Sequence, residues 1–469
     1  MSDENVKVSV NSQVIYNVVG IVIRSSVVFF TMPLFTRILG TVEYGKFSVY
    51  SSWMAIIICF IGLNVSAGLS KGYYKFSNEY YQFRSSVIML GVISCFFVTI
   101  FLMVCYPAIA RFIKFPISIY FLLLCEATAQ FILNFANLAW TYEKKAKLNM
   151  LVSVCILIAT TLLALVLLKY NWLNLEYRYY ARVIGGAIPQ IIGAICIFLA
   201  FVWRGKKIYC KKYWNYSLSI GIPLIFHLVS QQILGQSDRV MMQMMNIDSS
   251  QIGIYSFVYS FTGFLTIILS ALNNAWCPFY FDCLSNCNYD KLEEMIRNYV
   301  EIFTSLVGGF LLLSREVVRF FADESYQAGD DLIPVIVIAI YIIFSYQFAV
   351  NYEMFYEKPR IIACGTVIAA LINVFLNYLW ISKYGMVGAA FATLISYFLL
   401  AILHFVVVFS WEKNKYPMTI KYNFIGFFIV IILCLVFHFA KGLIILRWGL
   451  ACVIGCSVIY KVYSRKTIF

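Results

Sequence analysis

The stretch SLSIGIPLIFHLVSQQILGQSDRVMM, residues 217–242, is mostly apolar for about 20 residues and then ends on an acidic and a basic residue, Asp238 and Arg239. An apolar run of about 20 residues is the length that an α-helix needs to cross the hydrocarbon core of a bilayer. The rest of the chain is similar, because 62% of its 469 residues are hydrophobic and only 12% are charged. A chain of this composition cannot hide its apolar surface from water by folding alone, so we expect it to lie in a membrane.

Apolar runs of this length recur along the whole sequence, and we count fourteen. In lipid every backbone amide needs a hydrogen-bond partner within the protein, so only helices or closed barrels can span a membrane. Runs that are continuously apolar, rather than alternating, favour helices. The sequence therefore predicts an all-α integral membrane protein with about 14 transmembrane helices. The expected spans are 13–35, 44–64, 85–107, 115–139, 148–168, 180–203, 217–240, 252–275, 297–314, 331–352, 361–381, 386–410, 419–440 and 442–462.

Basic residues between these spans indicate the orientation of the chain. The N-terminus, the even-numbered loops and the C-terminal tail hold 22 lysines and arginines, whereas the odd-numbered loops hold 13. Because short loops rich in Lys and Arg remain on the cytoplasmic side, we expect both termini to be cytoplasmic, with RGKKIYCKKYW (204–214) as the strongest marker. The first run follows MSDENVKVSV, which has neither a basic segment nor a cleavage site of small residues, so we expect no signal peptide.

Several classes of protein are disfavoured by what the sequence contains. The net charge of +14 is spread over many loops, so it fits a membrane surface better than nucleic acid. The fourteen cysteines include no CxxC pair, and the group Cys277, Cys283 and Cys287 has no nearby histidine, so we expect no metal site. The chain has no large hydrophilic domain and no GxxxxGK[ST], HExxH or GxSxG motif, so we expect no enzyme.

Weak internal similarity suggests that the chain is built from two halves. YGKFSVYSSW (44–53) matches IGIYSFVYSF (252–261) at Gly, aromatic and Ser positions with an offset of 208, and a Lys-Tyr pair recurs with an offset of 214. Chance is the alternative explanation, since these residue types are common in membrane helices. The repeat predicts an N-lobe of six spans (1–203), a basic cytoplasmic linker (204–216), a C-lobe of six spans (217–410), and two further spans with a cytoplasmic tail (411–469).

Four segments resemble the oligosaccharide flippase family of the multidrug/oligolipid/polysaccharide (MOP) exporter superfamily, and the resemblance covers essentially the whole chain. They are TRILGTVEYGKFSVY (36–50), GLNVSAGLSKGYY (62–74), the stretch from SDRVMM to IGIYSFVYSF (237–261) with the later Pro278, and INVFLNYLWISKYGMVGAAFATLISYF (372–398). The chain departs from the family pattern at Lys71, where arginine is common, and at YNWLNLEYRYYARVIGG (170–186), which replaces a glycine-rich turn.

The resemblance implies a flippase for polysaccharide biosynthesis that works by alternating access. Its substrate would be an undecaprenyl-pyrophosphate-linked oligosaccharide repeat unit, moved across the plasma membrane (the bacterial inner membrane) for O-antigen, capsule or exopolysaccharide assembly. The implied partners are this lipid-linked glycan, membrane lipids, and the polysaccharide polymerase and chain-length machinery.

A lipid-linked glycan carries a pyrophosphate and many hydroxyl groups, so its carrier needs a polar, cationic path inside the helices. Polar residues do recur on single helix faces in the first, fourth and seventh spans. These residues are Gln13, Asn17, Arg24 and Thr31; Glu126, Gln130, Asn134 and Asn137; and His227, Gln231 and Asp238. Hydrogen bonding between neighbouring helices is the alternative role for the amides. Arg24 lies deep in a span, where a charge is functional by default, so we expect it to bind the pyrophosphate.

Other charged residues are candidates for a gate or for ion coupling. Asp238 and Arg239, with Arg37 as their equivalent in the first half, predict an ion pair between the lobes, or alternatively a pair anchored at the headgroups. His227 is either a packing residue or a proton relay with Asp238. Four residues near span ends are further candidates, for which extension of the side chain to the membrane surface is a complete alternative explanation. These are Lys71, Arg182, Arg315 and Glu353.

No cofactor is expected, so the energy for transport has to come from elsewhere. Either a proton or sodium gradient is coupled through carboxylates such as Glu126 or Asp238, or synthesis on one side and polymerisation on the other drive the exchange. Three alternative functions remain open: a drug or small-cation antiporter of the same superfamily, a peptidoglycan-precursor (lipid II) flippase, and a membrane polysaccharide polymerase.

Overall fold

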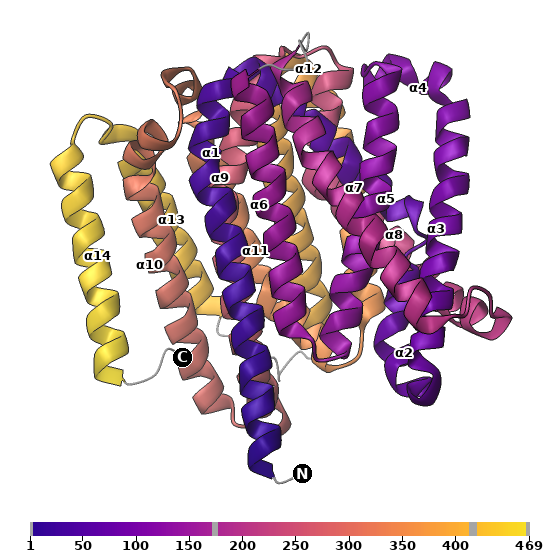
Figure 1. The fold of residues 1–469 in the computed structure, drawn as a ribbon. Coiled ribbons are helices and arrows are strands. Elements are labelled where there is room, and N and C mark those ends of the chain that lie inside the picture. Colours follow the sequence, from indigo (N-terminus) through magenta and orange to yellow (C-terminus); the bar gives the residue numbers. More distant parts are fainter. Residues whose placement is uncertain (1–2, 171–176, 412–419, 466–469) are drawn as a thin grey trace. The chain divides into compact units, whose positions relative to one another are not determined.

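The computed structural model describes the backbone of residues 3–170, 177–411 and 420–465. Within these ranges the chain forms fourteen α-helices and three short 3-10 helices and contains no β-strand (Figure 1). The all-α fold expected from the apolar runs is therefore confirmed. The first ten elements are α1 (Asp3–Ile61), η1 (Val65–Gly68), α2 (Leu69–Lys75), η2 (Ser77–Glu79), α3 (Tyr80–Val104), α4 (Tyr106–Ile113), α5 (Ile117–Tyr142), α6 (Ala146–Tyr170), α7 (Arg178–Gly205) and α8 (Lys211–Met244). The others are α9 (Ser249–Ser285), α10 (Tyr289–Phe321), η3 (Glu324–Gly329), α11 (Leu332–Phe355), α12 (Pro359–Trp411), α13 (Ile420–Phe439) and α14 (Ile444–Arg465).

Eleven helices of the described ranges are long and apolar enough to cross a membrane. Two of them account for two expected spans each. α1 contains 13–35 and all but the last three residues of 44–64, and α12 contains 361–381 and 386–410. The expected span 297–314 lies in α10, which has charged residues at both ends of its apolar middle and is not among the eleven. The chain is thus a multi-pass membrane protein.

Glycines with unusual backbone angles kink the two longest helices. Gly40 in α1 has φ 66° and ψ 178°, and Gly385 in α12 has φ 56° and ψ −130°. Positive φ is accessible to glycine because it lacks a Cβ atom. Each of these long helices thus consists of two helices that join at a glycine with non-helical backbone angles, one for each of the two expected spans.

The chain divides into two compact units, residues 1–250 and 251–469, each of which is described here by itself. Helix α8 belongs to the first unit, where it packs along α1 and η1. A Cβ atom on Gly221 of α8 would lie 2.7 Å from the carbonyl oxygens of both Leu63 and Asn64, so this close approach depends on glycine. The sequence repeat groups the same helix with the later ones, and the lobe boundaries drawn from it remain a prediction.

Small residues also allow the central helices of the first unit to approach closely. α7 packs against both α5 and α6. A Cβ atom on Gly185 of α7 would lie 2.4 Å from the Cα atom of Ala164 in α6, so these two backbones are in direct contact. Such close approach of small residues is typical of helix packing in membranes.

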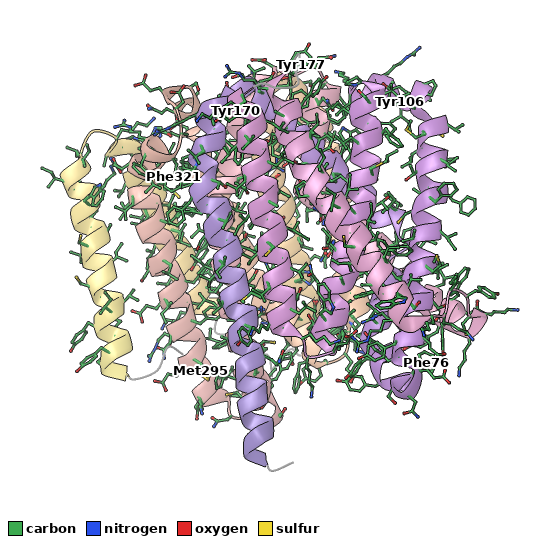
Figure 2. The ribbon with its side chains drawn as sticks, viewed as in Figure 1. Phe76, Tyr106, Tyr170, Tyr177, Met295 and Phe321 are labelled. Atoms are coloured by element: carbon green, nitrogen blue, oxygen red, sulfur yellow. The ribbon has the colours of Figure 1, made fainter. Side chains whose placement is uncertain are left out.

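Aromatic side chains mark both ends of the first unit. Tyr106, Tyr170 and Tyr177 lie at the end where α4 joins α3 to α5, and Phe76 lies at the opposite end beside α2 (Figure 2). Tyr170 is exposed. The ammonium group of Lys46 lies 4.0 Å from the ring centroid of Tyr177. Aromatic residues are enriched where a membrane helix meets water, so these ends match the two interfaces of a bilayer.

The second unit is built around α10 and α11. α10 packs against α13 and α14, and α11 packs against α12. Its core is aromatic: the ring of Tyr299 lies 5.0 Å from the ring of Trp276 and 5.1 Å from that of Phe344. Pairs of rings at these distances add to the stabilisation that comes from burial.

Candidate functional site

A polar cavity of about 260 Å³ lies inside the first unit, among helices that are otherwise apolar. Helices α1, α5, α6 and α7 each contribute polar side chains to its lining. These are Arg24; Gln130, Asn134 and Asn137; Ser153 and Thr160; and Gln190. One residue of the stripe expected in the first span and three of the stripe expected in the fourth span therefore line the same cavity.

Arg24 is the cation of this cavity. It is half-buried, and no Asp or Glu side chain of the described residues forms an ion pair with it. A guanidinium group carries five N–H donors in a planar fork that matches phosphate and carboxylate oxygens. The cavity thus combines one cationic anion-binding group with several amides that both donate and accept hydrogen bonds.

Part of the α5 stripe belongs to a buried hydrogen-bond chain that links three helices. Glu126 is 4% exposed and accepts bonds from the Tyr50 hydroxyl at 2.7 Å and from Gln190 Nε2 at 3.0 Å. Gln130 Nε2 donates to Gln190 Oε1 at 2.5 Å. These hydrogen bonds hold α1, α5 and α7 together. Hydrogen bonding between neighbouring helices, the alternative role considered for the amides, therefore applies to Gln130.

Arg182 lies near this chain and not at the membrane surface. Its guanidinium group is 3.8 Å from the ring centroid of Phe35 and 5.2 Å from that of Phe47, and its charge interacts with that of Glu126. Cation–π contacts of this kind stabilise a desolvated guanidinium. Extension of the side chain toward the headgroups, one explanation considered from the sequence, is therefore wrong for Arg182.

The remaining cavity candidates lie in different surroundings. Thr31 Oγ1 donates to the carbonyl oxygen of Val27 at 2.7 Å within its own helix, Lys71 is exposed on α2, and Gln231 is exposed on α8. The side chain of Asn17 lies outside the described residues. None of these contacts tests a binding role.

The pair Asp238–Arg239 lies inside α8, which continues to Met244. Both side chains are buried, Asp238 at 0% and Arg239 at 5% exposure, and Arg239 Nη1 donates to Gln236 Oε1 at 3.2 Å. Ser52 of α1 donates to the same oxygen at 2.9 Å. Anchoring at the headgroups, the alternative considered for this pair, is therefore wrong, because a headgroup anchor has to be exposed.

Two further gate candidates of the first unit are less buried than Asp238. Arg37 is exposed on α1. His227 is half-buried on α8, and its Nδ1 atom has no hydrogen-bond partner among the described residues. Since an α-helix rises about 1.5 Å per residue, His227 and Asp238 are separated by about 16 Å along α8 and cannot exchange a proton directly.

Two candidates of the second unit are buried beside other ionisable side chains. Glu353 of α11 is 0% exposed, and both of its carboxylate oxygens lie 2.9 Å from Nδ1 of His404 in α12. Arg315 of α10 is 4% exposed and lies 3.8 Å from Asp330 Oδ2 and 3.9 Å from Asp331 Oδ1. Extension to the membrane surface is therefore wrong for Glu353. Arg315 pairs with the exposed Asp331 just before α11, so for Arg315 this explanation remains a prediction. His404 had no signal in the sequence, because 51 residues separate it from its partner.

The part of the chain that forms this cavity matches a known protein family. The model of a family described as "Polysaccharide biosynthesis protein" matches residues 10–283, which include the whole polar cavity. The chain belongs to this polysaccharide biosynthesis protein family. Two curated relatives come from Haemophilus influenzae, an "Uncharacterized membrane protein" and "Lsg locus putative protein 1". Each is 22% identical, over 76% of this chain and 86% of the first relative and over 82% of this chain and 96% of the second.

Solved structures of transporters share the fold of this polysaccharide biosynthesis family member. The lipid II flippase MurJ in an inward closed conformation matches with a TM-score of 0.61 and 16% identity, over 89% of this chain and 98% of MurJ. An inward-facing multidrug resistance MATE family transporter of the MOP superfamily matches with a TM-score of 0.59 and 14% identity, over 84% of this chain and 99% of that one. The chain therefore shares its fold with these two transporters.

Proposed function

We propose that this protein translocates a polyprenyl-pyrophosphate-linked oligosaccharide across the plasma membrane by alternating access. The observation that supports this proposal best is Arg24, a cation without a carboxylate partner among the described residues, in a polar cavity inside membrane-spanning helices. Membership of the polysaccharide biosynthesis family supports the same class of substrate.

The chemistry of the cavity suits the part of such a substrate that cannot cross lipid. The guanidinium group of Arg24 would bind pyrophosphate oxygens through paired N–H donors. The amides of Asn134 and Asn137 would bind sugar hydroxyls, because an amide can donate to one hydroxyl and accept from another. The polyprenyl tail needs no such path and would remain in the lipid.

The same proposal includes the orientation and the energy source. Both termini would be cytoplasmic, in a bacterial inner membrane, and the glycan would pass to a polymerase and its chain-length machinery for O-antigen, capsule or exopolysaccharide assembly. Asp238, Arg239 and Arg37 would form the gate. A proton or sodium gradient acting through Glu126 or Asp238 would drive the cycle, and exchange driven by synthesis and polymerisation is the competing mechanism.

Translocation in proteoliposomes tests the proposal. A fluorescent lipid-linked oligosaccharide is followed for wild type, Arg24→Ala and Arg24→Lys, and also for Arg111→Ala, which removes an exposed arginine of α4 as a matched control. Loss of charge-assisted hydrogen bonds worth about 1.5–3 kcal/mol predicts a rate roughly 10- to 100-fold lower for Arg24→Ala and an intermediate rate for Arg24→Lys. The control should transport at the wild-type rate.

Folded Arg24→Ala protein that transports at the wild-type rate would refute the role of Arg24. Wild-type protein that moves a peptidoglycan precursor but not the oligosaccharide would refute the proposed substrate. Imposed proton or sodium gradients in the same vesicles separate ion coupling from simple exchange, since only coupling makes the rate depend on the gradient.

A further inference from the structure

A second hollow, in the second unit, is an apolar groove of about 320 Å³ between α11, α12 and α13. Buried Ile342 and Ala401 form its floor, and exposed rings and aliphatic chains form its rim, including Phe398, Ile402 and Phe424. Two of its lining residues are polar. One of them, Ser345, donates its hydroxyl hydrogen to the carbonyl oxygen of Tyr341 at 3.0 Å and is therefore satisfied.

The other polar residue, Asn423, has no hydrogen-bond partner. Its side chain is 6% exposed, and neither Nδ2 nor Oδ1 forms a hydrogen bond in the part of the chain that the structure describes. A buried polar group that is left unpaired costs about 1–3 kcal/mol, and such groups are rare in folded proteins. An amide in this position therefore points to a ligand that enters the groove and supplies the missing partner.

The dimensions of the groove limit what this ligand is. Along α12 the lining extends from Phe409 to Phe398, which corresponds to about 16 Å at 1.5 Å per residue. That is about half of the 30 Å hydrocarbon core of a bilayer, and thus the depth of one leaflet. Asn423 is the fourth residue of α13, so the polar group lies at one end of this apolar length, near the end of its helix.

We propose that the groove binds one membrane glycerophospholipid, with an acyl chain along α12 and the ester carbonyl of that chain accepting a hydrogen bond from Asn423 Nδ2. An ester carbonyl lies at the top of an acyl chain, which is where the groove places its amide. A polyprenyl chain fits less well, because between its phosphate and its far end it has no group that accepts a hydrogen bond. This site is independent of the proposed transport function and lies in a different unit from Arg24.

Binding of matched lipids to the purified full-length protein tests the site. The probes are a diester phosphatidylglycerol and its diether analogue, which has the same headgroup and chain length but no ester carbonyl, and both are titrated and followed by native mass spectrometry. One hydrogen bond to the carbonyl predicts that the diester binds roughly 2- to 10-fold more tightly to wild type. In Asn423→Leu this preference should disappear.

Two further measurements keep the result interpretable. Asn423→Leu removes an unpaired buried amide, so its thermal midpoint in lipid-free detergent should equal or exceed that of wild type. Ile402→Trp narrows the groove at an exposed rim position and should weaken both lipids without changing their ratio. Equal binding of diester and diether lipids to wild type would overturn the proposal. So would a preference that survives in Asn423→Leu, a lowered midpoint of that variant, or displacement of the phospholipid by polyprenyl phosphate at equal concentration.

Discussion

Replacing Tyr50 by Phe should destabilise the first unit by about 1–3 kcal/mol. The Tyr50 side chain is 1% exposed, and its hydroxyl donates to Glu126 Oε2 at 2.7 Å. The substitution keeps the ring and removes only the hydroxyl donor. Oε2 of Glu126, which is 4% exposed, then loses its partner, whereas Gln190 still donates to Oε1. Leaving a buried acceptor without its donor costs about 1–3 kcal/mol, and more where the acceptor is charged.

The free energy of unfolding is measured by SDS titration in mixed micelles, with tryptophan fluorescence as the signal. Tyr80→Phe is the matched control, because Tyr80 is 5% exposed and its hydroxyl has no hydrogen-bond partner among the described residues. This control should change stability by less than about 0.5 kcal/mol. In the Glu126→Gln background, Tyr50→Phe should be less damaging, since a neutral amide accepts a weaker bond. Equal losses for Tyr50→Phe and Tyr80→Phe would refute the reasoning.

Two predictions concern the second unit. His404→Phe should lower the free energy of unfolding by about 3–5 kcal/mol because it leaves Glu353, which is 0% exposed, without its partner, and adding Glu353→Leu should restore most of the loss in the same titration. Outside the spans, the Lys441 ammonium group, 2.9 Å from Asp331 Oδ1, holds the pKa of Asp331 below its usual value. A depressed pKa stabilises the folded state above the unfolded pKa of about 3.9, and this contribution is lost as the pH falls through the folded value. Asp331→Asn should therefore show a smaller decrease of thermal midpoint between pH 6 and pH 3 than wild type; an identical decrease would contradict the assignment.

The fold class could be predicted from the sequence because it depends on bulk properties. Continuous apolar runs and the backbone's need for internal hydrogen bonds leave helices as the solution, and single residues hardly affect that result. The kinks at Gly40 and Gly385 were harder to foresee. Each expected turn contains several charged or polar residues, yet the chain leaves helical backbone angles at a single glycine.

The candidate site was predicted in part, and the limit is the distance along the chain between partners. Helical spacing placed Arg24 and Gln130 on polar faces, and both line the cavity. Spacing within one helix cannot show which residue of another helix lies opposite, so Tyr50, Gln190 and His404 were missed although each bonds a carboxylate that the sequence singled out. For the same reason the sequence could not show that Asp238 is buried. Its position near the end of an apolar run does not reveal which other helices cover it.

The backbone at Gly40 has a consequence for how this gene can vary. Its angles, φ 66° and ψ 178°, fall in a region that is essentially restricted to glycine, yet no neighbouring atom lies within 4 Å of the position that a Cβ atom would occupy. Every missense change of one nucleotide in a glycine codon introduces a side chain. A saturation mutagenesis library selected for function should therefore be depleted at Gly40 in all substitutions, including alanine, although the site has room for them. The bend between the two parts of α1 therefore depends on a single codon.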